Sequence, residues 1–271
     1  MKMPELPEVQ TVADHVKPEI IGNYILSVDP VWNKVLDNFD SKDIEGRHKI
    51  LDVTRRAKFI IIQFENFLLA IHLRMTGKLY VLENDIYPKH TSAIFSLEKG
   101  KKLIFEDTRK FGRIYRYNDL TEINKRHGPE PLSSDFNTNW FIKNMKSKKR
   151  NIKALLLDQS FLSGLGNIYV DESLWASGIH PNSISCHIPK QKIILLHKNI
   201  RRILQESIEQ LGTTFISFTF LNGQSGNYSN ELKIFGKQGC SCEKCKNKII
   251  KLKVSGRGTH VCNQCQKVYK S

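Results

Sequence analysis

The sequence is short of acidic residues and of long apolar runs. Its 27 Asp and Glu residues stand against 42 Lys and Arg residues, so the formal net charge is +15. This excess disfavours a cationic partner and favours a polyanion such as nucleic acid or a membrane surface. No stretch approaches the roughly 20 apolar residues of a membrane helix, and the first residues lack the apolar core of a signal peptide. We therefore expect a cytoplasmic protein that contacts no membrane.

Cysteines are few, and most of them follow one pattern. Four of the six form two C-x2-C pairs separated by 16 residues: Cys242, Cys245, Cys262 and Cys265. This spacing lets four thiolates surround zinc, and a closed four-thiolate set leaves no ligand position for water. We predict one structural Zn²⁺ ion, with Cys186 and Cys240 unligated. This cysteine usage fits a reducing compartment, and we expect no disulfide.

The distribution of apolar residues predicts an α+β protein of two domains. Leu6, Val9 and Val12 recur at helical spacing beside early prolines, which favours a helix near the N-terminus. From Ile25 to Tyr117, closely spaced β-rich runs are typical of a β-sandwich or barrel. Helical spacing then returns and stops near Gly212. The predicted borders are 1–118 for the N-terminal domain, 119–136 for a linker, 137–236 for a helical domain and 237–271 for a zinc finger.

Positive charge gathers in two runs. From Lys143 to Lys153 six basic residues meet no acid, and from Lys237 to Ser271 nine basic residues meet only Glu243. The second run contains Arg257 between two glycines, which let a backbone approach a phosphate closely. A solvated surface is the alternative interpretation of each run, so neither run alone identifies a partner.

Six short motifs stand in order along the chain. They are Pro4-Glu5-Leu6-Pro7-Glu8, the runs 55–59 and 71–77, Asp107-Thr108-Arg109-Lys110-Phe111-Gly112, the run 164–169, and the cysteine tail. Together they resemble the bacterial formamidopyrimidine-DNA glycosylases over nearly the whole chain. Leu6 is typical of that branch, whereas the related endonuclease VIII branch usually has glycine there.

The resemblance implies both a fold and an activity. The fold is an N-terminal β-sandwich with an N-terminal helix, a helix-two-turn-helix domain and a four-cysteine zinc finger, which bind double-stranded DNA between them. The activity is excision of oxidised purines such as 8-oxoguanine and formamidopyrimidines, followed by cleavage of the backbone at the abasic site. We expect the protein to act as a monomer.

Pro4 matches the family's nucleophile, an N-terminal proline. A free α-amine has a pKa of about 8, so a useful fraction is unprotonated at neutral pH. Its attack on the sugar C1′ gives a cationic iminium, which draws the electrons that β- and δ-elimination require. Glu5 matches the acid that protonates the opening sugar ring, and Lys58 matches the basic residue that holds the flanking phosphates. Glu8 either positions this site or only favours the helix dipole.

The first residues depart from the family pattern. Family members begin Met-Pro-Glu, whereas Met1-Lys2-Met3 precede Pro4 here. Pro4 acylated by Met3 has no free amine, so we expect translation to start at Met3, whose removal before proline is ordinary. The alternatives are a damaged-DNA-binding relative without catalysis and an endonuclease VIII-type glycosylase for oxidised pyrimidines.

Met75, Arg109 and Phe111 match the family's three intercalating residues. Extruding a base leaves a hole in the stack, which an apolar wedge can fill while an arginine hydrogen-bonds the orphaned cytosine. Burial in a core is the commoner fate of such methionine and phenylalanine side chains. The resemblance assigns five further residues to backbone phosphates: His72, His90, Lys153, Asn167 and Arg257.

The glycine-containing stretch from Thr213 to Tyr228 matches a loop that closes over the everted base in the family. We therefore assign lesion recognition to this stretch. A plain connector is the alternative.

Overall fold

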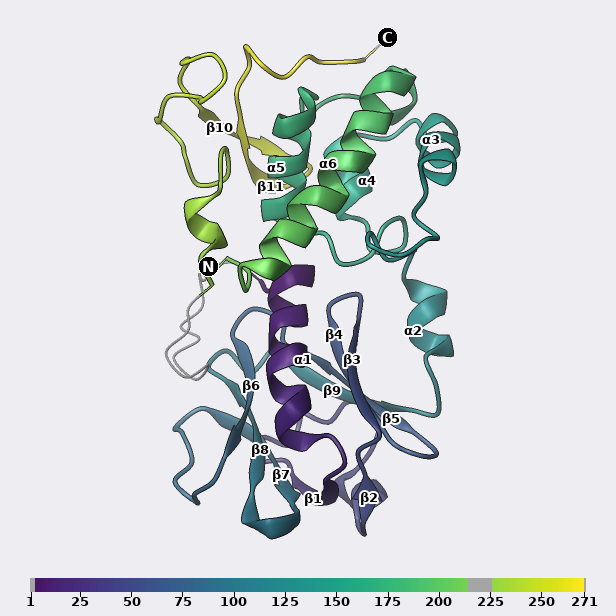
Figure 1. The fold of residues 1–271 in the computed structure, drawn as a ribbon, viewed down its shortest axis with the longest axis vertical. Coiled ribbons are helices and arrows are strands. Elements are labelled where there is room, and N and C mark those ends of the chain that lie inside the picture. The colour runs from purple at the N-terminus through teal and green to yellow at the C-terminus, as the bar shows by residue number, and fades with distance from the viewer. Residues whose placement is uncertain (1–2, 214–225, 271) are drawn as a thin grey trace. The chain divides into compact units, whose positions relative to one another are not determined.

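A computed structural model describes residues 3–213 and 226–270 of the chain (Figure 1). The chain divides into two units, residues 1–125 with 211–226 and residues 126–210 with 227–271. Among the residues described, the first unit holds two β-sheets with α-helices at both ends of its chain segment, and the second holds helices and a two-stranded hairpin, which confirms the predicted α+β class. Among the residues described, no helix is long and apolar enough to cross a membrane.

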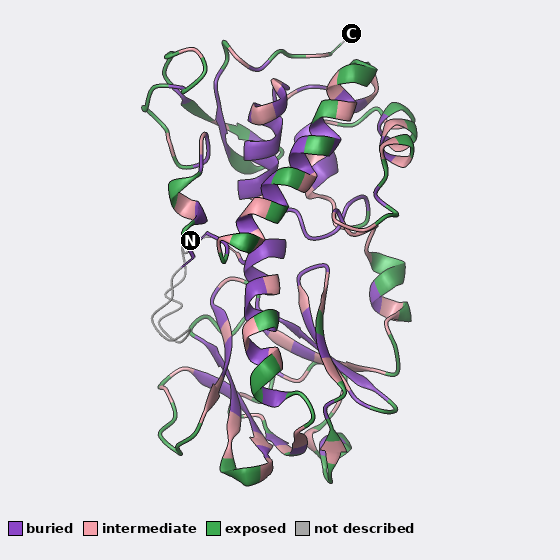
Figure 2. Cartoon of the chain, in the orientation of Figure 1, coloured by how far each residue is buried: buried purple, intermediate pink, exposed green. Residues whose placement is uncertain are grey.

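Helix α1 (Leu6–Ile20) begins where the sequence predicted. Its start is a capping box, in which the Glu5 carboxylate accepts the backbone N–H of Glu8. In return, the Glu8 carboxylate accepts the backbone N–H of Glu5 at 3.0 Å. Pro7 lies in the first turn, where its missing N–H costs no helical hydrogen bond. One face of α1 is buried along its length (Figure 2).

The first unit is a β-sandwich, as predicted. One sheet has the strand order β2-β1-β7-β8-β6 and the other has the order β3-β4-β5-β9. Buried side chains of both sheets and of α1, among them Val9, Ile60 and Phe105, form one core. The elements are β1 (Tyr24–Asp29), a 3-10 helix (Ser41–Ile44), β2 (His48–Lys49), β3 (Asp52–Arg56), β4 (Phe59–Gln63), β5 (Leu68–His72), β6 (Gly77–Leu82), β7 (Thr91–Leu97), a 3-10 helix (Glu98–Gly100), β8 (Lys102–Asp107) and β9 (Arg113–Tyr117).

A short helix, α2 (Thr121–Arg126), lies within the stretch predicted to be a linker. Only Ile123 of this helix is buried, so the segment lacks the apolar repeat that would have identified it from sequence.

The second unit is built around α5, which is buried on nearly every side (Figure 2). Helices α4 and α6 and strand β11 pack against it. Helix α6 buries Ile193, Leu196 and Ile200 and ends shortly before Leu211 and Gly212, which both have positive φ. The elements are α3 (Thr138–Lys146), α4 (Ile152–Leu157), α5 (Asn167–Ser177), a 3-10 helix (Ser185–His187), α6 (Lys190–Glu209), a 3-10 helix (Tyr228–Asn230), β10 (Ile250–Val254) and β11 (Arg257–Val261).

Candidate functional site

The first turn of α1 gathers the predicted nucleophile and two acids. Pro4, Glu5 and Glu8 are all buried. Oε1 of Glu8 accepts the backbone N–H and the hydroxyl of Thr213, each at 2.9 Å. Gly212 permits this approach, because a Cβ there would lie 3.0 Å from the same oxygen. Residues 214–225 of the predicted lesion-recognition loop lie outside the described residues.

Lys58 and His72 lie at one end of the four-stranded sheet, because Phe59 pairs with His72 across β4 and β5. Lys58 follows Ala57 in the two-residue turn between β3 and β4, and Ala57 has a φ of 54°. Lys58 is only 5% exposed, whereas a lysine ahead of a strand is usually solvated. The ring of His72 meets Phe59 edge-on at 4.8 Å, and its Nδ1 accepts the N–H of Arg74 at 3.0 Å.

The three predicted intercalating residues lie together on two loops. Arg109 connects them, because its Nη1 lies 3.1 Å from the sulfur of Met75 and its Cζ lies 4.6 Å from the centre of the Phe111 ring. Met75 is half-buried, and Phe111 is 47% exposed. Met75 and Phe111 are therefore not core side chains, although the sequence left that alternative open.

A buried carboxylate that the sequence analysis missed holds these two loops together. Asp107 Oδ1 accepts the hydroxyl of Thr76 and the N–H of Arg109, and its Oδ2 accepts the N–H of Gly112 at 2.7 Å. The backbone N–H of Asp107 donates to the carbonyl of His90 at 2.9 Å, which places the half-buried His90 beside the same loop. The sequence offered one signal for this role. An aspartate in a loop often accepts the backbone N–H of the residue two positions later, which is an Asx-turn, and Asp107 stands two positions before Arg109.

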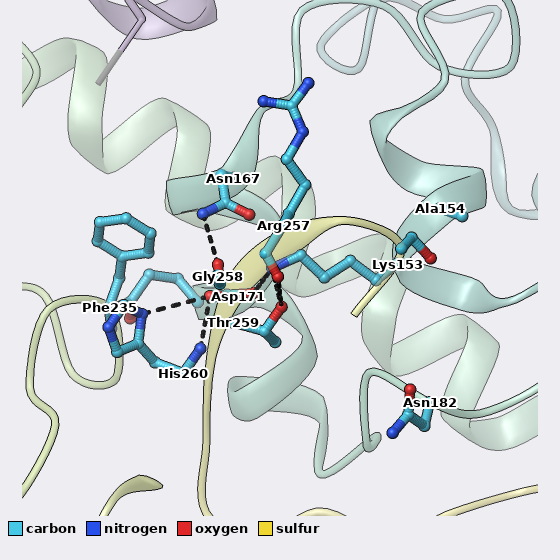
Figure 3. Close-up of polar contacts among 12 residues, drawn as sticks. Lys153, Ala154, Asn167, Asp171, Asn182, Phe235, Arg257, Gly258, Thr259 and His260 are labelled. Carbon is cyan, nitrogen blue, oxygen red and sulfur yellow. Dashed lines mark hydrogen bonds and ion pairs between the residues drawn. The ribbon is translucent and has the colours of Figure 1, made fainter. Parts of the chain in front are cut away.

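In the second unit, Asn167 contacts the hairpin strand β11 at the residue that follows Arg257 (Figure 3). Asn167 begins α5, and its Nδ2 donates to the carbonyl of Gly258 at 2.9 Å. Arg257 is exposed and begins β11 directly after a two-residue turn, in which Ser255 and Gly256 both have positive φ. Paired positive φ values are typical of type I′ hairpin turns.

Lys153 does not share this exposed position. Its side chain is 0% exposed, and its ammonium lies 2.6 Å from the carboxylate of Asp171. This position disfavours the direct phosphate contact that we expected of Lys153.

Glu172, which follows Asp171 on α5, holds the segment that leads into the zinc finger. Its carboxylate accepts the backbone N–H groups of Lys233, Ile234 and Phe235 at 2.8 to 3.1 Å. Burial raises the pKa of Glu172 above its ordinary value, against the lowering effect of the three backbone donors. Sequence analysis missed this residue, because nothing local to an apolar helix reveals a partner about 60 residues away.

The four predicted cysteines converge. The sulfur atoms of Cys242, Cys245, Cys262 and Cys265 all lie within 4.8 Å of one another. A tetrahedral site with Zn–S bonds of about 2.3 Å requires sulfur atoms about 3.8 Å apart, and Cys242 and Cys265 are separated by 3.8 Å. The donor set therefore fits one zinc ion, as predicted. When bound, zinc supplies a cross-link that holds the two knuckles at the base of the β10–β11 hairpin.

Replacing Asp107 tests whether it organises the loops of Met75 and Arg109. In Asp107→Asn an amide N–H₂ replaces one acceptor oxygen, so either the buried hydroxyl of Thr76 or the buried N–H of Gly112 loses its acceptor. We expect a loss of about 1–3 kcal/mol in the free energy of unfolding. The control is Asp119→Asn, because Asp119 accepts the N–H of Thr121 in a similar turn but is exposed. Urea unfolding checks this, and equal losses in both variants would contradict the role of Asp107.

Zinc content tests the metal site. We expect one zinc ion per chain in the purified protein and in Cys240→Ser, because Cys240 is exposed and lies outside the four-cysteine cluster. Cys262→Ser removes a ligand, so it should lose zinc and, with the hairpin loosened, bind DNA more weakly. Elemental analysis and DNA titration measure the two effects. A metal-free wild-type protein prepared without chelator would refute the site.

Comparison with protein-family models gives three matches along the chain. Residues 3–114 match the formamidopyrimidine-DNA glycosylase N-terminal domain. Residues 127–219 match the formamidopyrimidine-DNA glycosylase H2TH domain, and residues 242–268 match the zinc finger found in FPG and IleRS.

Whole-length relatives agree with these matches. The formamidopyrimidine-DNA glycosylases of Lactobacillus helveticus and Pelotomaculum thermopropionicum are 40% and 41% identical, cover 99% and 98% of this chain, and are themselves matched over 100% of their length. A solved structure of MutM in complex with carbocyclic 8-oxo-G containing DNA has a TM-score of 0.90 at 36% identity, covering 97% of this chain and 100% of that one. The Lactococcus lactis enzyme bound to AP-site DNA has a TM-score of 0.89 at 36% identity, covering 97% and 99%. The chain belongs to the formamidopyrimidine-DNA glycosylase family.

Proposed function

We propose that this protein excises oxidised purines from double-stranded DNA and then cleaves the backbone at the abasic site. The observation that carries the proposal is the cluster of Met75, Arg109 and Phe111 on two adjoining loops. The Phe111 ring is 47% exposed and lies against the guanidinium of Arg109, so it does not stabilise a core. Such a wedge fits the task of filling the stack from which a base has been extruded.

The chemistry starts from the amine of Pro4, once the chain begins at that residue. The amine forms a bond to C1′ as the glycosidic bond breaks and the base leaves, and Glu5 protonates the sugar ring oxygen as the ring opens. The resulting iminium acidifies the C2′ proton, and loss of that proton expels the 3′ phosphate by β-elimination. A second elimination, δ to the iminium, expels the 5′ phosphate. Lys58 is assigned to the flanking phosphates.

Sequence-independent contacts complete the proposed DNA interface. His72, His90, Asn167 and Arg257 are assigned to backbone phosphates, which position the duplex without reading its sequence. Because all of these groups come from one chain, we infer that the protein acts as a monomer. A reducing cytoplasm suits the unpaired zinc-binding thiols.

The substrate class follows from relatives of similar structure. Solved neighbours hold DNA with carbocyclic 8-oxo-G, with Fapy-dG or with an abasic site. We assign the same lesions to this chain, and the alternative substrate class is the oxidised pyrimidines.

Single-turnover excision tests the proposed function. We expect release of 8-oxoguanine, fastest opposite cytosine, and much slower release of thymine glycol. Arg109→Ala should slow excision and flatten the dependence on the opposite base, at a cost of about 1–3 kcal/mol for one good base contact.

The control is Lys110→Ala, which removes the same charge from the neighbouring exposed position of the loop. It should leave the opposite-base preference intact. If both variants change only the salt dependence of binding, Arg109 is another phosphate contact and the wedge assignment fails. Faster release of thymine glycol than of 8-oxoguanine would favour the pyrimidine-glycosylase alternative.

A further inference from the structure

A buried ion pair joins two helices of the second unit. Lys153 lies on α4 and Asp171 on α5, and the side chains of both are 0% exposed. Their charged groups approach to 2.6 Å. Removing two charges from water is costly, so such a pair persists only where further hydrogen bonds satisfy the remaining donors and acceptors. The partners that supply those hydrogen bonds show what the pair holds in place.

Further hydrogen bonds of this pair go to the zinc-finger hairpin. The ammonium of Lys153 donates to the hydroxyl of Thr259 at 2.8 Å, and Asp171 Oδ2 accepts the backbone N–H of His260 at 2.9 Å. The hydroxyl of Thr259 in turn donates to the carbonyl of Arg257 at 3.0 Å. A chain of contacts therefore runs from the helices to the backbone of Arg257 (Figure 3).

Helix α5 makes a second hydrogen bond to the hairpin through Asn167, one helical turn before Asp171. Asn167 and Asp171 are four residues apart and share a face of the helix. Asn167 holds the carbonyl of Gly258, and Asp171 holds the N–H of His260. The three residues after Arg257 are thus each hydrogen-bonded to α4 or α5. They are Gly258, Thr259 and His260.

The side chain of Arg257 itself points away from this network. In Figure 3 its guanidinium extends upward past Asn167, away from the hydrogen bonds that join Lys153, Asp171 and Thr259. A long exposed arginine on a hairpin loses conformational entropy when it binds a ligand. If its backbone is already fixed, only the side chain must be ordered, so the entropy cost of binding is smaller.

We propose that Lys153, Asp171 and Thr259 are positioning residues, which hold Arg257 and Asn167 in the arrangement that contacts a DNA backbone. The inference rests on the proposed function, because it takes Arg257 to bind a phosphate. Lys153 affects DNA binding indirectly, because its ammonium hydrogen-bonds Thr259, which hydrogen-bonds the backbone of Arg257. The positive charge of Lys153 is paired with Asp171.

Thr259 allows the sharpest test, because it can be changed without altering charge. Thr259→Val removes the hydroxyl at nearly constant shape, and Thr259→Ser keeps it. The probe is a duplex carrying a stable abasic-site analogue. We expect Thr259→Val to bind about tenfold more weakly and to lower the salt slope by about one unit, as loss of one phosphate contact does. Thr259→Ser should stay within about twofold of wild type.

A double-mutant cycle with Arg257→Ala separates positioning from general stability. In wild type, Arg257→Ala should weaken binding about tenfold, and in the Thr259→Val background it should weaken binding less than about twofold, because the same contact is already lost. Zinc content and thermal midpoint are measured for every variant. A merely structural role would lower the midpoint and leave the two substitutions additive in binding.

Lys153→Met gives an independent second test, with Lys149→Met as its control, since Lys149 is an exposed member of the same basic run. Lys153→Met should couple to Arg257→Ala as Thr259→Val does, whereas Lys149→Met should be additive with it. Additive losses for both Thr259→Val and Lys153→Met would overturn the inference while leaving the proposed function intact. If Arg257→Ala alone leaves binding unchanged, the phosphate role of Arg257 fails, and the inference fails with it.

Discussion

Buried carboxylates that accept backbone N–H groups hold loops and strands in place within each unit of this strongly basic protein. Glu8, Asp107, Asp171 and Glu172 are each less than 5% exposed. A carboxylate so far from water is stable only when donors surround it, and here the donors include the N–H groups of loops or strands. Glu8 binds a residue 205 positions away, and Asp171 binds one 89 positions away. Each carboxylate thus fixes one segment, and these segments carry or adjoin the predicted site residues.

This arrangement suits a protein that must hold DNA of any sequence. Exposed side chains such as Arg109, Phe111 and Arg257 lie on turns whose backbones are already ordered, so binding costs less conformational entropy than it would on free loops. Positively charged side chains attract the phosphates, and buried acids fix the backbone that carries these side chains. Asp107 holds the loop of Arg109, and Asp171 holds the strand of Arg257. The net charge of +15, which already counts these buried acids, produces the field that attracts a polyanion.

Local patterns in the sequence predicted the elements and the metal site. The spacing of Leu6, Val9 and Val12 identified α1, and two C-x2-C pairs identified four sulfur atoms that do converge. Contacts between distant residues were not predictable in this way. Lys153 looked like one more surface lysine of a basic run, and its burial depends on Asp171 and Thr259, which lie on other elements. Likewise, the family resemblance assigned a role to Arg109, but only the structure shows that Asp107 holds the loop of Arg109 to that of Met75.

We propose that the amine of Pro4 performs excision, and covalent trapping tests this role. Protein produced to begin at Pro4 is incubated with an 8-oxoguanine duplex and borohydride, digested, and the DNA-linked peptide is identified by mass spectrometry. Because borohydride reduces an iminium to a stable amine, we expect a cross-link at Pro4, and none with protein that retains Met1 to Met3. Equal trapping of the protein that retains Met1 to Met3, or a cross-link at a lysine, would show that Pro4 is not the nucleophile.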